Sequence, residues 1–83
     1  GLVNHVVELD ELIPLCEKIA NKIMRNSSVA ISKAIKAINA NYTDGKDGYK
    51  VEIKQFGKCF GTKDFVEGTT AFLEKRKAEF PGE

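Results

Sequence analysis

The chain has 83 residues with 13 basic and 12 acidic side chains, which leaves a formal net charge of +1. A chain of this length forms one domain at most and buries only roughly 60% of its unfolded surface, so it is marginally stable by itself. The near balance of charge argues against nucleic acid as the main partner, because binding to a phosphate backbone needs a clear positive excess. No stretch approaches the ~20 apolar residues of a membrane-spanning helix, so we expect no membrane partner either.

The basic residues and the cysteines are unevenly spread. Residues 27–61 hold six lysines against three acidic residues. They form either a local basic patch or, as surface lysines on helices usually do, a solvated face, and we favour the second interpretation. Cys16 and Cys59 are far apart and lack the spacing of metal ligands. We expect both to be buried free thiols in a reducing cytoplasm.

Residues 1–7 read Gly-Leu-Val-Asn-His-Val-Val, a short apolar run that predicts a buried strand. A lone strand leaves its backbone groups unpaired and needs a neighbour. No later segment offers a partner, because the rest of the chain has helical patterns. We therefore expect the neighbouring strands to lie upstream, and the chain to be the C-terminal piece of a larger protein.

A first helix is predicted after Asp10, which is placed to cap it. Pro14 falls in or near its first turn, where the missing N–H does least harm. Apolar residues recur along one side at helical spacing: Leu12, Leu15, Cys16, Ile19, Ile23 and Met24.

Two further helices follow the polar break at residues 26–28. The second is expected from about Val29 to Tyr42 and the third from about Tyr49 to Phe60. Residues 43–48 contain two glycines and predict a turn-rich loop between these helices. Gly57 would lie inside the third helix, at a cost of up to about 1 kcal/mol relative to Ala.

The segment from Thr62 to Gly82 carries start and stop signals of a fourth helix. Thr62 can accept a hydrogen bond from the first turn, and the carboxylate of Asp64 suits the positive helix end. Basic residues 75–77 crowd the expected last turns, and Pro81 and Gly82 are expected to end the helix. The predicted fold class is mainly α, with a short N-terminal strand followed by about four helices.

Phe72 and Lys75 are the candidate binding residues of this last segment. They are three positions apart and would lie side by side on one helix face. An apolar ring beside a long cation suits a ligand with an apolar arm and a phosphate.

No residues of the chain make a convincing catalytic or metal site. His5 has no Cys, Ser or carboxylate partner nearby in the sequence, so we expect a structural or solvent-facing role. Glu67 and Glu74 are seven apart on one face, but the nearness of Glu74 to Lys75 and Lys77 indicates surface pairing. Acid–base catalysis would need a site that tunes the pKa values of the carboxylates. We therefore assign no catalytic residue and no metal ligand.

Several blocks resemble the C-terminal portion of the crotonase (enoyl-CoA hydratase/isomerase) superfamily. The terminal block is most similar to short-chain enoyl-CoA hydratases, including bacterial 3-hydroxybutyryl-CoA dehydratases. The blocks are Gly1-Leu-Val-Asn4 with Val6-Val7, Glu11-Leu12, Ile19-Ala20, Ala30, Lys33, Ala37-Ile38-Asn39, Cys59-Phe60-Gly-Thr62-Lys-Asp64, Glu67-Gly68 and Ala71-Phe72-Leu-Glu-Lys-Arg-Lys77-Ala-Glu-Phe80.

The resemblance implies a ClpP/crotonase-like fold in which residues 1–83 are the C-terminal helical trimerisation region. An upstream spiral of ββα units, absent from this chain, would carry the oxyanion-hole amides and the two catalytic glutamates. The helices would cover the site and build trimers or dimers of trimers. The position of Phe72 would pack near the acyl and pantetheine part of the thioester, and that of Lys75 would reach the nucleotide phosphates of CoA.

The function implied by the resemblance is reversible addition of water to trans-2-enoyl-CoA, as in the conversion of crotonyl-CoA to 3-hydroxybutyryl-CoA. CoA thioester is then the substrate and no cofactor is expected. The enzyme would be cytoplasmic, with the mitochondrial matrix as an alternative, and the chain alone would be inactive. Two alternatives remain: a small helical module that binds acyl-CoA or a partner, and the tail of another crotonase-family enzyme such as an isomerase.

Overall fold

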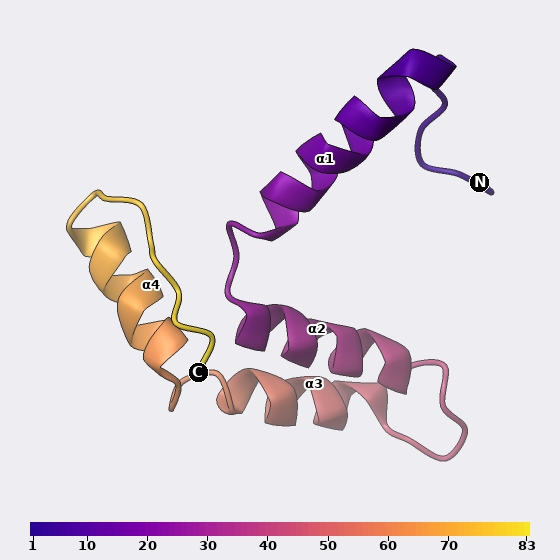
Figure 1. The fold of residues 1–83 in the computed structure, drawn as a ribbon. Helices are drawn as coiled ribbons and strands as arrows, with labels where there is room; N and C mark the ends of the chain where they lie inside the picture. Colours follow the sequence, from indigo (N-terminus) through magenta and orange to yellow (C-terminus); the bar gives the residue numbers. More distant parts are fainter.

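The computed structural model describes residues 1–83, and its regular secondary structure is entirely helical (Figure 1). A short 3₁₀ turn, η1 (Leu9–Glu11), leads into α1 (Leu12–Ile23). The remaining helices are α2 (Ser28–Ala40), α3 (Gly48–Gly57) and α4 (Lys63–Leu73). The prediction of a mainly α chain with four helices is confirmed.

The N-terminal segment differs from the prediction. Residues 1–8 are irregular and exposed, so the predicted strand is wrong for this chain. A strand needs another extended segment to pair its N–H and C=O groups, and the chain has none. Asp10 does not cap α1 either, because it lies inside η1, whose N-cap residue is Glu8. His5 is exposed, as expected.

Helices α2 and α3 lie side by side as an antiparallel pair (Figure 1). Ser27 caps α2 by accepting a hydrogen bond from the Ala30 N–H at 3.0 Å. The loop then brings the start of α3 against the end of α2. A Cβ at Gly48 would come within 1.9 Å of Asn41 Oδ1, so a larger residue there would have to displace the exposed Asn41 side chain.

Both helices of this pair are shorter than predicted. α2 ends at Ala40 instead of Tyr42, and α3 ends at Gly57 instead of Phe60. Gly57 is therefore the last residue of α3 and does not interrupt a helix interior. The low helix propensity of glycine therefore favours the end of α3 at this position and does not weaken its interior.

Helix α4 begins as predicted and ends seven residues early. Thr62 caps it by accepting a hydrogen bond from the Phe65 N–H at 3.1 Å. The helix stops at Leu73, because Lys75 adopts a left-handed conformation with φ 54°. Residues 74–83, here called the C-terminal strap, then run back along α4 to its first turn (Figure 1).

The chain reversal has the hydrogen bonds of a Schellman motif. The Lys75 N–H donates to the Phe72 carbonyl at 3.3 Å, and the Arg76 N–H donates to the Ala71 carbonyl at 3.0 Å. The predictions that residues 75–77 form the last helical turns and that Pro81 and Gly82 end the helix are therefore wrong.

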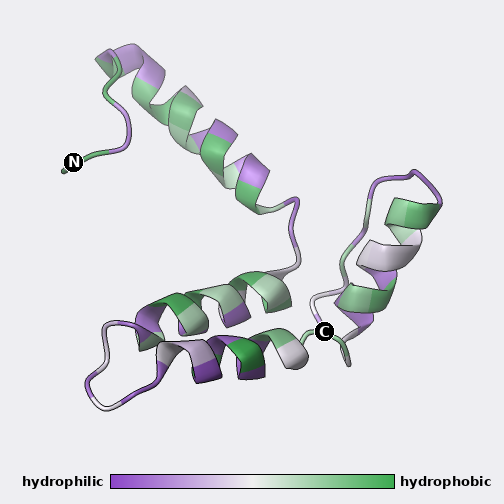
Figure 2. Cartoon of the chain, turned by 180° about the vertical axis from the view of Figure 1, so that it is seen from behind, coloured by the Kyte–Doolittle hydropathy of each residue, from purple (hydrophilic) through white to green (hydrophobic).

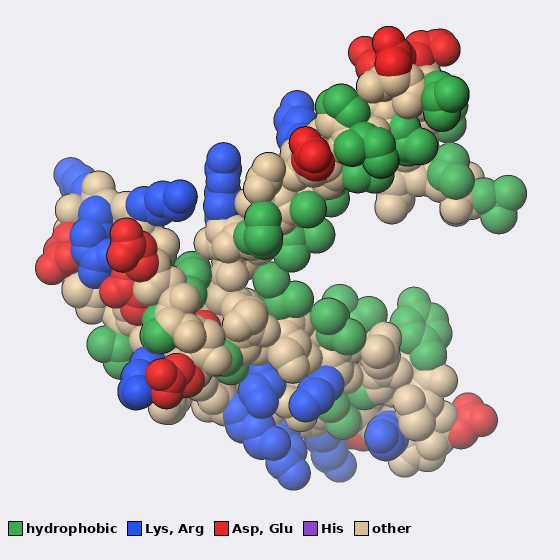
Figure 3. Space-filling model, viewed as in Figure 1, with side chains coloured by type: hydrophobic (Ala, Val, Ile, Leu, Met, Phe, Trp, Pro, Cys, Tyr) green, Lys and Arg blue, Asp and Glu red, His purple; other side chains and the backbone are tan.

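The molecule is open and flat. Its radius of gyration is 16.3 Å, against about 12 Å for a compact chain of this length. Only four residues are buried: Ser27, Ala40, Asp64 and Ala71. Figure 2 shows that hydrophobic positions recur along α1 and α2. Their side chains gather on the concave side between these helices and remain exposed (Figure 3).

The cysteines reflect this open arrangement. Both are free, and Cys59 is half-buried. Cys16 is exposed, which contradicts the predicted burial, because α1 has no packing partner within the chain. None of the helices has the length and apolar character that crossing a membrane would require.

Candidate ligand-binding segment

Asp64 joins three parts of the chain at the start of α4. Its side chain is buried, with the residue 2% exposed. One carboxylate oxygen accepts from the Ser27 hydroxyl, and the other accepts from the backbone N–H groups of Gly82 at 2.7 Å and Glu83 at 3.2 Å. The Asp64 N–H in turn donates to the Glu83 carbonyl at 2.8 Å. The cap of α2, the start of α4 and the end of the strap are thereby fastened to one side chain.

The hydrogen bonds at Asp64 keep it ionised. Burial alone would raise the pKa of Asp64, but the hydrogen bonds from Ser27, Gly82 and Glu83 outweigh it and lower the pKa below its ordinary value. The sequence placed Asp64 in the first turn of the helix correctly. The pairing with Ser27, 37 residues away, had no signal in the sequence.

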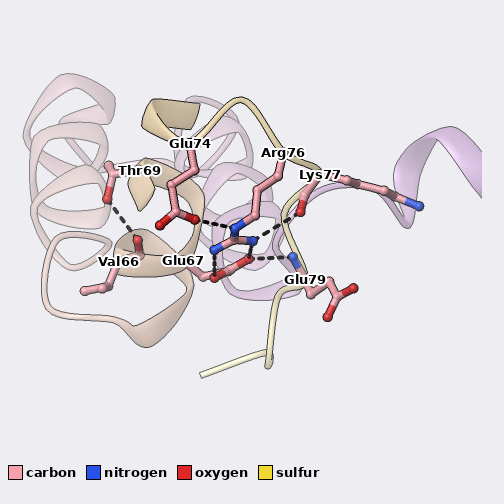
Figure 4. A network of polar contacts seen from close by, with 7 residues as sticks. All are labelled: Val66, Glu67, Thr69, Glu74, Arg76, Lys77 and Glu79. Carbon is pink, nitrogen blue, oxygen red and sulfur yellow. Dashed lines mark hydrogen bonds and ion pairs between the residues drawn. The ribbon is translucent and has the colours of Figure 1, made fainter. Parts of the chain in front are cut away.

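Glu67 and Arg76 form a second fastening, halfway along α4 (Figure 4). The guanidinium donates two parallel hydrogen bonds to the carboxylate, Nη1 to Oε1 at 2.7 Å and Nη2 to Oε2 at 3.0 Å. The Glu79 N–H donates to the same Oε1 at 2.8 Å. Arg76 Nε also donates to Glu74 Oε2 at 2.6 Å. Glu74 pairs at the surface as predicted, but its partner is Arg76 and not Lys75 or Lys77, and the pairing of Glu67 with Arg76 was not predicted.

This network sets the charge states of the two partners. The hydrogen bonds from Arg76 and from the Glu79 N–H lower the pKa of Glu67 to about 2. The carboxylates of Glu67 and Glu74 raise the pKa of Arg76 further. Near neutral pH Glu67 is ionised and both of its carboxylate oxygens accept hydrogen bonds, so it is poorly suited to proton transfer.

The structure changes the geometry predicted for Phe72 and Lys75. Phe72 lies in the last turn of α4 and is 83% exposed. Lys75 is also exposed, but it lies beyond the helix, so the two residues do not share a helical face. Lys75 is the only non-glycine residue with positive φ. Such a conformation costs about 1–3 kcal/mol, and glycine is the usual residue at this position of a helix end.

Three open grooves lie elsewhere, and neither Phe72 nor Lys75 lines them. The largest, about 850 Å³, runs between the α1–α2 junction and the strap and includes Arg25, Lys77 and Phe80. A second of about 390 Å³ lies between α4 and the start of α2, and a third of about 510 Å³ lies between α2 and α3. The sequence missed the first groove because it depends on the chain reversal. No cluster of three His, Cys, Asp or Glu side chains is placed to hold a metal ion.

The whole chain, residues 1–83, matches the sequence model of the family described as "Enoyl-CoA hydratase/isomerase". The chain belongs to this family. The resemblance drawn from the sequence blocks is confirmed.

Similar proteins include a crotonyl-CoA hydratase of Syntrophomonas wolfei, 46% identical over 81 residues, which cover 96% of this chain and 31% of the relative. A short-chain-enoyl-CoA hydratase of Clostridium acetobutylicum is 45% identical over 80 residues, which cover 95% of this chain and 31% of that protein. The solved structure of an enoyl-CoA hydratase/isomerase from Mycobacterium abscessus superposes on all of this chain and on 35% of its own length, with a TM-score of 0.85 and 32% identity. The chain thus spans about a third of the length of these relatives.

Proposed function

We propose that this chain is the C-terminal helical part of an enoyl-CoA hydratase that reversibly adds water to trans-2-enoyl-CoA, converting crotonyl-CoA to 3-hydroxybutyryl-CoA. The observation that carries the proposal is the similarity of nearly the whole chain to two proteins named as hydratases of crotonyl-CoA and short-chain enoyl-CoA. The rest of the enzyme supplies the groups that polarise the thioester carbonyl, position the water and transfer the proton. The longer protein is called the intact enzyme below.

Phe72 and Lys75 contribute to the CoA site in this proposal. Phe72 offers an exposed ring for the acyl and pantetheine part of the substrate. Lys75 offers a cation for a nucleotide phosphate of CoA, and it makes no ion pair within the chain. Glycine would be less strained than lysine at this backbone conformation. The presence of lysine there supports a role for its side chain. CoA thioester is the substrate, and the hydration requires no cofactor.

The intact enzyme is a homo-oligomer in this proposal, either a trimer or a dimer of trimers. The exposed apolar faces of α1 and α2 support it, because large apolar patches mark interaction surfaces. The proposed compartment is the cytoplasm, with the mitochondrial matrix as the alternative, since one similar protein, from Pongo abelii, is a mitochondrial enoyl-CoA hydratase.

The test compares the 83-residue chain with the intact enzyme by following the loss of enoyl-thioester absorbance with crotonyl-CoA. We expect turnover from the intact enzyme and none above buffer from the chain alone. Turnover by the purified chain would refute the assignment of chemistry to the rest of the enzyme. An intact enzyme that shifts the double bond of a 3-enoyl-CoA but does not hydrate crotonyl-CoA would reassign the function to an isomerase.

A further inference from the structure

The left-handed conformation of Lys75 is held by neighbours on both sides of it. Backbone hydrogen bonds from Lys75 and Arg76 close the helix end. Those bonds alone would not favour lysine over glycine at this position, because the strain comes from the Cβ atom. Contacts that the strap makes with α4 beyond the helix end can offset this strain.

Among these contacts, those of Glu67 lie nearest to the reversal. Its carboxylate accepts hydrogen bonds from Arg76, one residue after Lys75, and from the backbone N–H of Glu79, four residues after it. The forked pairing with Arg76 fixes direction as well as distance. The Glu67 side chain is 20% exposed and is anchored in the middle of α4, so the strap is tied to a rigid element.

Glu74 contacts the same guanidinium but has a different role. It makes one hydrogen bond to Arg76, through Nε at 2.6 Å, and its side chain is 56% exposed. It is the C-cap residue of α4 and belongs to the reversal itself, so it cannot tie the strap back to the helix. Figure 4 shows Glu67 and Glu74 converging on Arg76 from different parts of the chain.

We propose that Glu67 is a positioning residue: by clamping Arg76 and the Glu79 amide, it holds the chain reversal that presents Lys75 to the nucleotide phosphate of CoA. The inference rests on the proposed CoA-binding function of Lys75. It assigns no chemistry to Glu67, which touches neither substrate nor reacting atoms.

The test uses the Glu67→Gln variant of the intact enzyme, with Glu74→Gln as the matched control and Arg76→Lys as a second way of breaking the fork. Amide hydrogen exchange at Arg76 and Glu79 reports on the reversal without any ligand. Steady-state kinetics with a CoA thioester and with a pantetheine thioester, which lacks the nucleotide, report on Lys75.

Glu67→Gln and Arg76→Lys are expected to speed exchange at both amides and to raise KM for the CoA thioester about three- to tenfold, with kcat and the pantetheine substrate nearly unchanged. Glu74→Gln is expected to change both readouts by less than twofold. Unchanged exchange in Glu67→Gln would overturn the positioning role. The positioning role would also be overturned if Glu67→Gln showed faster exchange but a wild-type KM while Lys75→Ala raised KM in the same assay. A wild-type KM for Lys75→Ala would instead overturn the proposed phosphate contact, while the exchange data would still show whether Glu67 holds the reversal.

Discussion

The side chains that matter most are two carboxylates that accept hydrogen bonds and one lysine that makes no ion pair within the chain. Asp64 and Glu67 are ionised carboxylates whose oxygens are occupied by donors from the strap and from α2. Lys75 has no such partner, and its backbone is the strained position of the chain. One prediction concerns the unpaired Lys75, and a second concerns Ser27, which donates a hydrogen bond to Asp64.

Lys75→Ala in the intact enzyme should raise KM for CoA thioesters about tenfold, since a hydrogen bond to a charged group contributes about 1.5–3 kcal/mol before salt screening. The effect should shrink as the salt concentration rises and nearly vanish for a pantetheine thioester. Phe72→Ala serves as the comparison and should impair both substrates, because its ring would touch the part that they share. Equal impairment of both substrates by Lys75→Ala would instead indicate a role in packing.

Ser27→Ala should loosen the start of α2, because Ser27 is both its N-cap and a donor to Asp64. Loss of an N-cap costs about 1 kcal/mol, which corresponds to roughly fivefold faster amide exchange at Ala30. Faster exchange at Gly82 should accompany it, because Asp64 also holds that amide. Ser28→Ala is the matched control, since the Ser28 hydroxyl makes no hydrogen bond, and it should leave both amides unchanged. Equal effects of the two substitutions would argue against the cap and the link to Asp64.

The strap is the element whose stability depends most on charge. It is fastened by the carboxylates of Asp64 and Glu67 and by an ion pair between Lys63 and Glu83 at 2.8 Å. Phe80 packs over α4 as well, because a Cβ at Gly68 would lie 3.2 Å from its ring. The strap is therefore held to α4 at two places, by Glu67 near the reversal and by Asp64 and Lys63 near its end.

Acid should release the strap. The pKa of Glu67 is lowered from 4.5 to about 2 in the folded chain, and that of Asp64 is also lowered. Groups with lowered pKa values stabilise the folded state above their ordinary pKa, and that stabilisation is lost as the pH falls through the folded value. Amide exchange at Glu79, corrected for its intrinsic pH dependence, should stay protected from pH 7 to about 5 and lose protection between about pH 4.5 and 2. The Gly82 amide, which Asp64 holds, should likewise lose protection only in acid, because the pKa of Asp64 is lowered as well.

The control for this prediction is Glu67→Gln, in which the protection of Glu79 should be weaker and should no longer vary with pH over that interval. Protection of Glu79 that persists unchanged down to pH 2 in the unaltered chain would contradict the prediction. Protection that disappears above pH 5 would contradict it as well, because neither carboxylate changes its charge there.

The whole molecule exposes more surface than a self-contained domain of its size. Its accessible surface is 7250 Å², against about 4900 Å² for a compact monomer of the same mass. The excess of roughly 2300 Å² is in the range that obligate interfaces bury. Such an excess agrees with a chain that spans about a third of the length of its relatives.

The isolated chain should consequently self-associate. We expect dimers or larger species in sedimentation at micromolar concentration, because apolar faces of this extent are unstable in water. The circular dichroism of these species should be helical. A single monomer peak combined with cooperative thermal unfolding would contradict the prediction and would favour the alternative of an independent helical module.

The sequence alone determined the features that depend on neighbouring residues. Periodicity and capping side chains predicted four helices, the Thr62 cap and the loop at residues 43–48, because helical hydrogen bonds and caps form within a few positions. The family also followed from the residue blocks.

Only the tertiary structure decided the features that join distant residues. The pairing of Asp64 with Ser27, the early end of α4 and the turn at Lys75 depend on the strap folding back onto Glu67 and Asp64. Local signals at residues 75–82 favoured a longer helix, but the hydrogen bonds and ion pairs of the reversed chain outweighed them. The predicted strand failed for the related reason that strand pairing is non-local, and this chain holds no partner for residues 1–7.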